Sequence, residues 1–180
     1  MVPMGRPTIP FSIPRTATVI TTRTVRAAVA GLLRLARPLN CLMSAVGVGI
    51  GGIVGVGSAA WAALAAPLVL AAAAAAAFTA GGNALNDIFD RETDRINHPD
   101  RPLASGRLTL GAARIFAVST FALAALLALF INRPALAIVA VNVMLMVSYE
   151  AWLKARGAVG NLVIAYLVGS LFLFAGVSVF

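Results

Sequence analysis

The 180-residue chain is 61% hydrophobic and only 11% charged, whereas about 25% of the residues of a soluble domain are charged. Its net charge of +8 would suit a nucleic-acid-binding module, but such a module gathers basic residues on one polar face, and here they flank long apolar stretches. A single cysteine, Cys41, excludes an internal disulfide and a cysteine metal cluster. The composition predicts an integral membrane protein that has membrane lipids, and no nucleic acid, as partners.

Residues 1–37 form a basic segment with several arginines, from Arg6 to Arg37, and no acidic residue. We expect a disordered cytoplasmic tail that its arginines hold against anionic headgroups. A cleaved targeting peptide, which is also rich in arginine and hydroxyl residues, is the alternative. The transmembrane domain is expected to begin at residue 38 and to include residues 38–180.

No charged residue occurs between Pro38 and Asn86, and this stretch is too long for one crossing, because about 20 residues span a bilayer. It predicts two transmembrane helices, 39–56 and 64–85, with a break near Gly57 and Ser58. The first contains three glycines at four-residue spacing, which is typical of close helix packing in membranes: Gly47, Gly51 and Gly55. The second contains a run of alanines, 71–77, which also indicates a packing surface.

Three more spans are expected at 115–132, 134–147 and 160–180. The predicted fold is therefore all-α, a multi-pass transmembrane helical bundle of about five spans. Of the 14 basic residues, all except Arg133 fall on one side of this arrangement. The positive-inside rule then predicts a cell-membrane protein whose tail and polar loops, 86–106 and 148–156, are cytoplasmic.

All acidic residues except Glu150 lie within residues 81–106. If the second span continues as a helix to about Asp94, a rotation of about 100° per residue places five polar side chains on one stripe: Asn83, Asn86, Asp87, Asp90 and Asp94. Glu92 faces elsewhere and is expected to be solvated. Carboxylates at this spacing repel one another, so the stripe requires a cation or protonation.

Magnesium satisfies this requirement, because it takes oxygen ligands and uses one or two carboxylates together with waters and substrate phosphates. The stripe therefore predicts a Mg²⁺ site at which Asp87, Asp90 and Asp94 are the ligands and a diphosphate is the substrate group. Arg91 is then placed to contact the remaining phosphate oxygens. The alternative is a solvated acidic helix that Arg91 and Arg95 neutralise.

The pattern Asn86-x-x-x-Asp90-x-x-x-Asp94, with Asp87 after the asparagine and the run RPLASG from Arg101 to Gly106, resembles the first aspartate-rich motif of the UbiA-type intramembrane prenyltransferases. The resemblance implies a fold of about nine helices. It also implies a Mg²⁺-dependent enzyme that transfers a prenyl group from its diphosphate to an acceptor. Asp90, Asp94 and Lys154 would be catalytic, and six residues would bind substrate: Asn86, Arg91, Arg101, Tyr149, Arg156 and Asn161.

The second polar loop, 148–160, lies on the same predicted face as the aspartates. Lys154 and Arg156 there can hold phosphate charge that the metal leaves uncompensated. The family has a Tyr-x-x-x-Lys element at this place, whereas Tyr149 and Lys154 are spaced one residue wider. The alternative is a positively charged anchor in which Tyr149 and Trp152 are interface aromatics.

Leu153-Lys154, Gly160-Asn161 and the run RPLNC from Arg37 resemble the family branch that makes the second ether bond of archaeal membrane lipids. That branch implies geranylgeranyl diphosphate as donor and geranylgeranylglyceryl phosphate, a lipid phosphate, as acceptor. An aromatic acceptor such as 4-hydroxybenzoate is one alternative, and a non-enzymatic transport or structural subunit is another. The family has a second aspartate motif, but no carboxylate follows Glu150, so we expect the domain to be incomplete at its carboxyl end.

Overall fold

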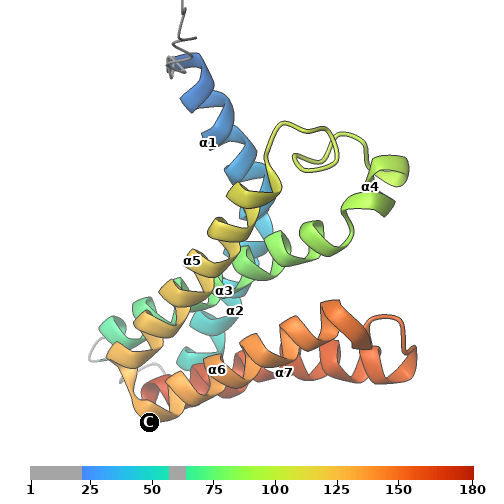
Figure 1. The fold of residues 1–180 in the computed structure, drawn as a ribbon. Helices are drawn as coiled ribbons and strands as arrows, with labels where there is room; N and C mark the ends of the chain where they lie inside the picture. Colours follow the sequence, from blue (N-terminus) through green and yellow to red (C-terminus); the bar gives the residue numbers. More distant parts are fainter. Residues whose placement is uncertain (1–21, 57–63) are drawn as a thin grey trace, which may run out of the picture.

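The computed structural model describes residues 22–56 and 64–180, and over these residues it is built from helices (Figure 1). The elements are α1 (Thr22–Ala36), α2 (Pro38–Val56), α3 (Ala65–Phe89), α4 (Arg91–Asn97), α5 (Leu110–Ile131), α6 (Arg133–Ser148), a single π-helical turn η1 (Tyr149–Leu153) and α7 (Ala158–Val179).

Five helices are long and apolar enough to cross a membrane: α2, α3, α5, α6 with its η1 extension, and α7. The predicted all-α bundle of five spans is therefore confirmed. The third span starts at Leu110, earlier than expected, because the Thr109 side chain accepts a hydrogen bond from the Ala112 backbone N–H at 3.2 Å and caps the helix. The predicted break at Gly57 and Ser58 lies outside the described residues.

The expectation of a disordered tail is wrong for residues 22–36, which form α1; residues 1–21 lie outside the described part of the chain. These residues form a helix because they have an apolar face, which is difficult to recognise in the sequence among the arginines. Leu35 on that face is fully buried and packs in one cluster with Leu103, Leu108 and Ala84. Most helical stability comes from such packing of an apolar face, and α1 has a partner for its face.

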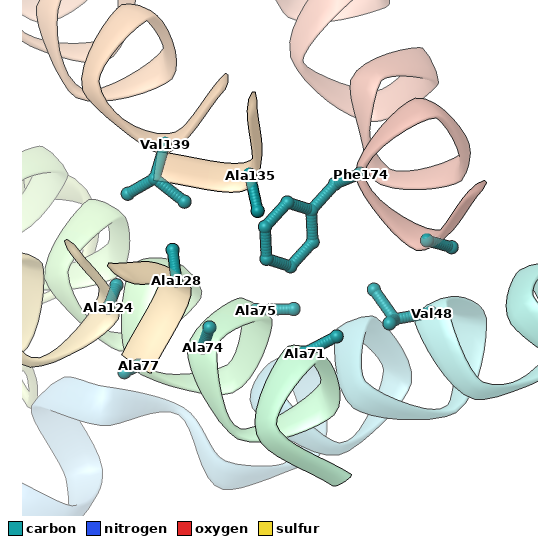
Figure 2. Close-up of a cluster of buried hydrophobic side chains, with 11 residues drawn as sticks. Val48, Ala71, Ala74, Ala75, Ala77, Ala124, Ala128, Ala135, Val139 and Phe174 are labelled. Atoms are coloured by element: carbon teal, nitrogen blue, oxygen red, sulfur yellow. The ribbon is translucent and has the colours of Figure 1, made fainter. Parts of the chain in front are cut away.

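The bundle is organised around α3, which packs against α1, α2, α5 and α7. Six of the ten buried residues of α3 are alanines, and two more are glycines. Figure 2 shows Phe174 of α7 directed toward the region where α3 meets its neighbours, with Val48 of α2 beside it. The predicted alanine surface is thus a packing surface, and it consists of Ala71, Ala74, Ala75 and Ala77.

The glycine ridge of α2 lies against α7. A β-carbon added at Gly47 would come within 2.8 Å of Leu171, and one added at Gly51 would come within 3.0 Å of Ala175. Both distances are shorter than ordinary van der Waals contact. The glycines therefore allow α2 and α7 to approach closely, as their spacing predicts.

We expect Gly51→Leu to destabilise the protein by about 1–3 kcal/mol, because the new side chain must push α7 away from α2. Gly49→Leu is the matched control on the same helix, since a β-carbon there meets no atom within 4 Å. Unfolding by SDS in mixed micelles would measure both variants. Equal losses at the two positions would contradict the close approach of α2 and α7.

Candidate active site

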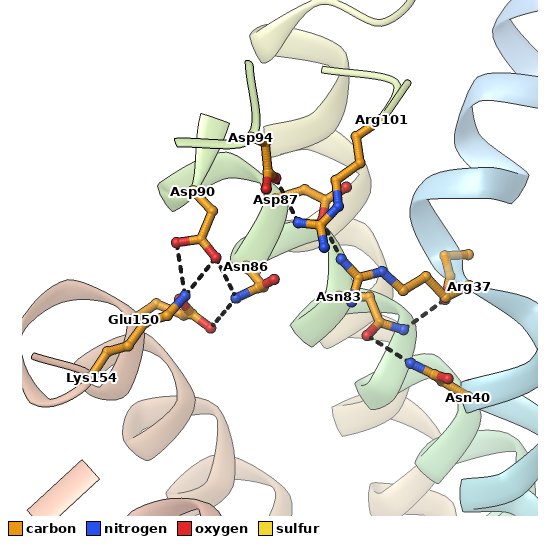
Figure 3. Close-up of polar contacts among 11 residues, drawn as sticks. Arg37, Asn40, Asn83, Asn86, Asp87, Asp90, Asp94, Arg101, Glu150 and Lys154 are labelled. Atoms are coloured by element: carbon orange, nitrogen blue, oxygen red, sulfur yellow. Dashed lines mark hydrogen bonds and ion pairs between the residues drawn. The ribbon is translucent and has the colours of Figure 1, made fainter. Parts of the chain in front are cut away.

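The polar site lies at one end of the bundle, where α2 and α7 begin and where α3 and α6 end. Figure 3 shows its side chains converging from separate parts of the chain. The aspartates come from the end of α3 and from α4, Arg37 comes from the junction of α1 and α2, and Lys154 follows η1. The loop between α4 and α5 contributes Arg101.

Two of the aspartates are buried and share arginine partners. Asp87 is 2% exposed and Asp94 is 4% exposed. Arg101 Nη1 lies 2.6 Å from Asp94 Oδ2 and 3.5 Å from Asp87 Oδ1, while Arg37 Nη2 lies 2.5 Å from Asp87 Oδ1. Burying a carboxylate is costly unless a cation pairs with it, and here the two guanidinium groups supply that pairing.

Arg37 reaches Asp87 from an unusual backbone conformation. Its φ of +51° is the only positive value at a non-glycine residue in the described part of the chain. Pro38 follows it, and the residue before a proline is disfavoured in the α-helical conformation, so α1 must end here. The left-handed conformation costs about 1–2 kcal/mol. It starts α2 in a new direction and leaves the Arg37 guanidinium at the aspartates.

The third aspartate belongs to a second group of charges. Lys154 Nζ lies 2.6 and 2.8 Å from the two carboxylate oxygens of Asp90 and 3.1 Å from Glu150 Oε2. Asn86 Nδ2 donates to Asp90 at 3.0 Å and to Glu150 at 3.1 Å. Partial burial lowers the pKa of Lys154, but its hydrogen bonds to Asp90 and Glu150 outweigh this and raise the pKa above the ordinary value. Lys154 is therefore held as a cation.

The predicted helix to Asp94 is interrupted at Asp90. α3 ends at Phe89 and α4 begins at Arg91, although helical hydrogen bonds continue across the break from Asp90 N to Asn86 O at 2.9 Å and from Asp94 N to Asp90 O at 2.7 Å. The carboxylates follow nearly helical positions, but they have different cationic partners. Lys154 holds Asp90, whereas Arg37 and Arg101 hold Asp87 and Asp94. The stripe is thus two neighbouring groups of charges.

Glu92 is solvated, as its predicted position requires, and its side chain is 63% exposed. It pairs with Arg91 at 2.5 Å and with Arg95 at 2.6 Å. The hydrogen bond from Arg91 lowers the pKa of Glu92. Arg91 therefore faces Glu92 in this structure, and its assignment to phosphate binding remains a prediction.

A cavity of about 440 Å³ opens beside these charges. Arg37, Asn83, Asn86, Tyr149 and Glu150 line its polar end. Apolar side chains of α3, α6 and α7 line the rest: Phe78, Met146, Ile164, Leu167, Val168 and Leu171. Its size is that of a small-molecule site, and its lining fits a ligand with a charged head and an apolar tail.

The remaining predicted site residues lie apart from these contacts. Arg156 and Asn161 are exposed, and within the described residues neither side chain bonds to the carboxylates. Sequence reasoning assigned no role to Glu150, although its side chain is only 1% exposed, or to Arg37. One feature of the sequence could have indicated a role for Arg37: it lies directly before the first span, on the same predicted side of the membrane as the aspartates.

Fold and site together define a polytopic membrane protein with an ion-paired polar centre at the mouth of an amphipathic cavity. The chain belongs to the UbiA prenyltransferase family, whose model matches residues 52–180. The resemblance of the aspartate motif to this family is thereby confirmed.

The chain is 48% identical over 142 residues to a digeranylgeranylglyceryl phosphate synthase of Methanopyrus kandleri, covering 79% of this chain and 51% of the relative. It is 42% identical over 147 residues to a protein of the same name from Methanothrix thermoacetophila, covering 82% and 54%. The chain thus spans about half the length of the curated relatives it matches.

Solved structures show the same fold. A structure described as digeranylgeranylglyceryl phosphate synthase in membranes matches with a TM-score of 0.76 at 36% identity, over 84% of this chain and 53% of that one. A UbiA homolog from Archaeoglobus fulgidus, bound to DMAPP and Mg²⁺, matches with a TM-score of 0.65 at 25% identity, over 82% and 54%.

Proposed function

We propose that the protein transfers a geranylgeranyl group from geranylgeranyl diphosphate to geranylgeranylglyceryl phosphate and forms an ether bond. The observation that carries this proposal is the junction between the charged centre and the apolar cavity. A prenyl diphosphate has the matching division into a charged head and an apolar tail. The names of the relatives from Methanopyrus and Methanothrix support the choice of donor and acceptor.

The carboxylates fit Mg²⁺ in donor type and in charge. Asp87, Asp90 and Asp94 offer hard oxygen ligands, and each already holds a cationic nitrogen at 2.5–2.8 Å. Among the described residues no three acidic, histidine or cysteine side chains lie close enough to hold a metal by themselves. Substrate oxygens would therefore share the coordination, as is usual for Mg²⁺. When bound, Mg²⁺ would neutralise charge on the departing diphosphate.

The chain's own groups would then perform the remaining tasks. Lys154, Arg37 and Arg101 would exchange part of their pairing with carboxylates for pairing with diphosphate oxygens, and so stabilise the leaving group as the allylic C–O bond breaks. Asn86, which bridges Asp90 and Glu150, would keep Asp90 oriented. The apolar side chains of the cavity, from Phe78 to Leu171, would exclude water from the allylic cation. The acceptor hydroxyl oxygen would then form the new C–O bond and lose its proton to the released diphosphate.

Tyr149 lines the polar end of the cavity, where we propose that it contacts the substrate. Arg91, Arg156 and Asn161 would take part only if the bound substrate reaches beyond the ion-paired residues. To contact the substrate, Arg91 would first have to break its ion pair with Glu92.

The test is diphosphate release by the purified full-length protein supplied with geranylgeranyl diphosphate. We expect Mg²⁺-dependent release that requires geranylgeranylglyceryl phosphate and stops with EDTA. Release that requires 4-hydroxybenzoate instead would favour the aromatic-acceptor alternative and overturn the proposed acceptor. No release with either acceptor would overturn the enzymatic function and favour a transport or structural role.

We further propose that the polar end faces the cytoplasm, because nearly all basic residues flank that end of the spans. With Cys41 replaced, a cysteine at Ser105 should resist an impermeant thiol reagent in intact cells and react after lysis. A cysteine at Arg133, at the opposite end of the spans, should react in intact cells. The reverse pattern would contradict the proposed orientation.

A further inference from the structure

The connection between α6 and α7 contains a turn with an unusual helical spacing. The two helices lie side by side and are joined by η1 and residues 154–157 (Figure 1). The Lys154 backbone N–H donates to the Tyr149 carbonyl oxygen at 2.9 Å, and this hydrogen bond spans five residues instead of the four of an α-helix. Single π-helical turns of this kind are frequent at functional sites. The residue at the end of η1 is Lys154, whose ammonium group binds Asp90.

The wide turn determines the direction in which the Lys154 side chain leaves the helix. Because the turn closes over five residues, Lys154 returns to nearly the same face as Tyr149. In a regular α-helix, with about 100° per residue, Lys154 would lie about 140° around the axis from Tyr149. Tyr149 lines the amphipathic cavity. The π-helical turn therefore directs Lys154 toward the side of the helix on which the cavity lies.

Gly160, in the first turn of α7, lies against the end of η1. It is buried, and a β-carbon added to it would lie 2.7 Å from the Leu153 carbonyl oxygen and 3.5 Å from the Lys154 Cα. At the other glycines of the described residues, the nearest atom to an added β-carbon belongs to a side chain, or no atom lies within 4 Å. A side chain can change its rotamer, whereas a backbone carbonyl moves only with its residue. Gly160 therefore permits a close contact between two backbones.

Lys154 binds two carboxylates that belong to different parts of the fold. Glu150 lies within η1 itself, whereas Asp90 directly follows α3. A lysine side chain is flexible and could reach one carboxylate from several backbone positions. Reaching both carboxylates at once, at 2.6–3.1 Å, restricts the backbone of Lys154 much more narrowly.

We propose that Gly160 is a positioning residue for Lys154. Together with the π-helical turn, it holds the Lys154 backbone where the ammonium group meets both Asp90 and Glu150. Gly160→Ala forces the end of η1 away from α7 and moves the ammonium group off Asp90. The consequence for catalysis rests on the proposed transfer reaction, in which Lys154 stabilises the departing diphosphate. The position of Lys154 itself can be measured without that reaction.

The first measurement is the rate at which an N-hydroxysuccinimide ester acetylates Lys154 in the full-length protein, in EDTA and without substrate. Lys154 is the only lysine among the 180 residues, and mass spectrometry of its peptide gives the rate. Gly160→Ala should be acetylated several-fold faster than the wild type, because its amine is released from the carboxylates. Gly169→Ala is the matched control on α7, since a β-carbon there meets no atom within 4 Å. Equal rates in all three proteins would overturn the inference.

The second measurement is the turnover number for diphosphate release. Gly160→Ala should lower it roughly 10- to 100-fold, since a displacement of about 1 Å at a catalytic group can cost about 10²-fold. In a Lys154→Met background the same change should cause little further loss, because Gly160 acts through Lys154. A loss as large as in the wild-type background would overturn the positioning role. An inactive wild type would contradict the proposed function, and the acetylation rates would still decide the position of Lys154.

An insertion tests the same inference if Gly160→Ala does not fold. One alanine inserted between Ala151 and Trp152 lengthens η1 without adding bulk beside Gly160. It should rotate Lys154 away from Asp90 and raise the acetylation rate several-fold. An unchanged rate would show that the flexible side chain reaches Asp90 from either backbone position, and it would overturn the inference.

Discussion

Asp90→Asn and Asp94→Asn should each lower the turnover number of the full-length enzyme by roughly 10²- to 10³-fold, the usual loss when one group that stabilises developing charge is removed. Asparagine keeps the shape and hydrogen bonding of aspartate but loses the charge that would hold Mg²⁺. The Mg²⁺ concentration needed for half-maximal rate should rise in both variants. Steady-state rates titrated against Mg²⁺ would measure both effects.

Glu92→Gln is the internal control for these two variants. Glu92 is also a carboxylate and lies between Asp90 and Asp94 in the sequence. It is solvated, however, and pairs only with Arg91 and Arg95 among the described residues. Its replacement should leave the rate and the Mg²⁺ requirement nearly unchanged. Near-normal activity in all three variants would contradict the metal assignment.

Arg101→Met should destabilise the protein by about 3 kcal/mol, because it leaves the buried Asp94 carboxylate without a cation. The loss should lie at the lower end of the range for buried pairs, since Arg101 is 27% exposed on its side chain and Asp87 keeps Arg37. Adding Asp94→Asn to this variant should recover most of the loss. SDS unfolding titrations of the single and double variants would measure this.

Arg95→Met provides the comparison, because it breaks an exposed pair with Glu92 and should cost less than about 1 kcal/mol. If the double variant were no more stable than Arg101→Met alone, the buried charge would not be the cause of the loss.

The apolar stretches predict the spans because membrane crossing depends on length and hydrophobicity alone, and both can be counted in the sequence. Helical spacing likewise places Asp87, Asp90 and Asp94 near one another. The sequence could not show which base pairs with which acid. Arg37 is separated from Asp87 by 50 residues and Lys154 from Asp90 by 64, so these pairings depend on how the helices pack.

α1 was missed for a related reason. The arginines of α1 suggest a solvated segment when the local sequence is considered alone. The stability of α1 depends instead on the packing of Leu35 against Leu103 and Leu108, which lie far along the chain. The division of the carboxylates is another tertiary effect, since Lys154 holds Asp90 while Arg101 holds Asp94. The local sequence pattern therefore predicts where the polar end of the bundle lies, but it does not predict that the carboxylates there form two separate groups.

The alanine surface of α3 has a thermodynamic consequence for the residues at its end. Ordering a buried leucine costs about 0.5–1 kcal/mol of side-chain conformational entropy, whereas an alanine has no rotamers to lose. The backbone of α3 therefore approaches its neighbours closely over this surface, and only a few larger side chains, such as Phe174, lie between them. Asn86 and Asp87 lie on the last turn of this helix and Asp90 directly follows it, so this packing also fixes their positions.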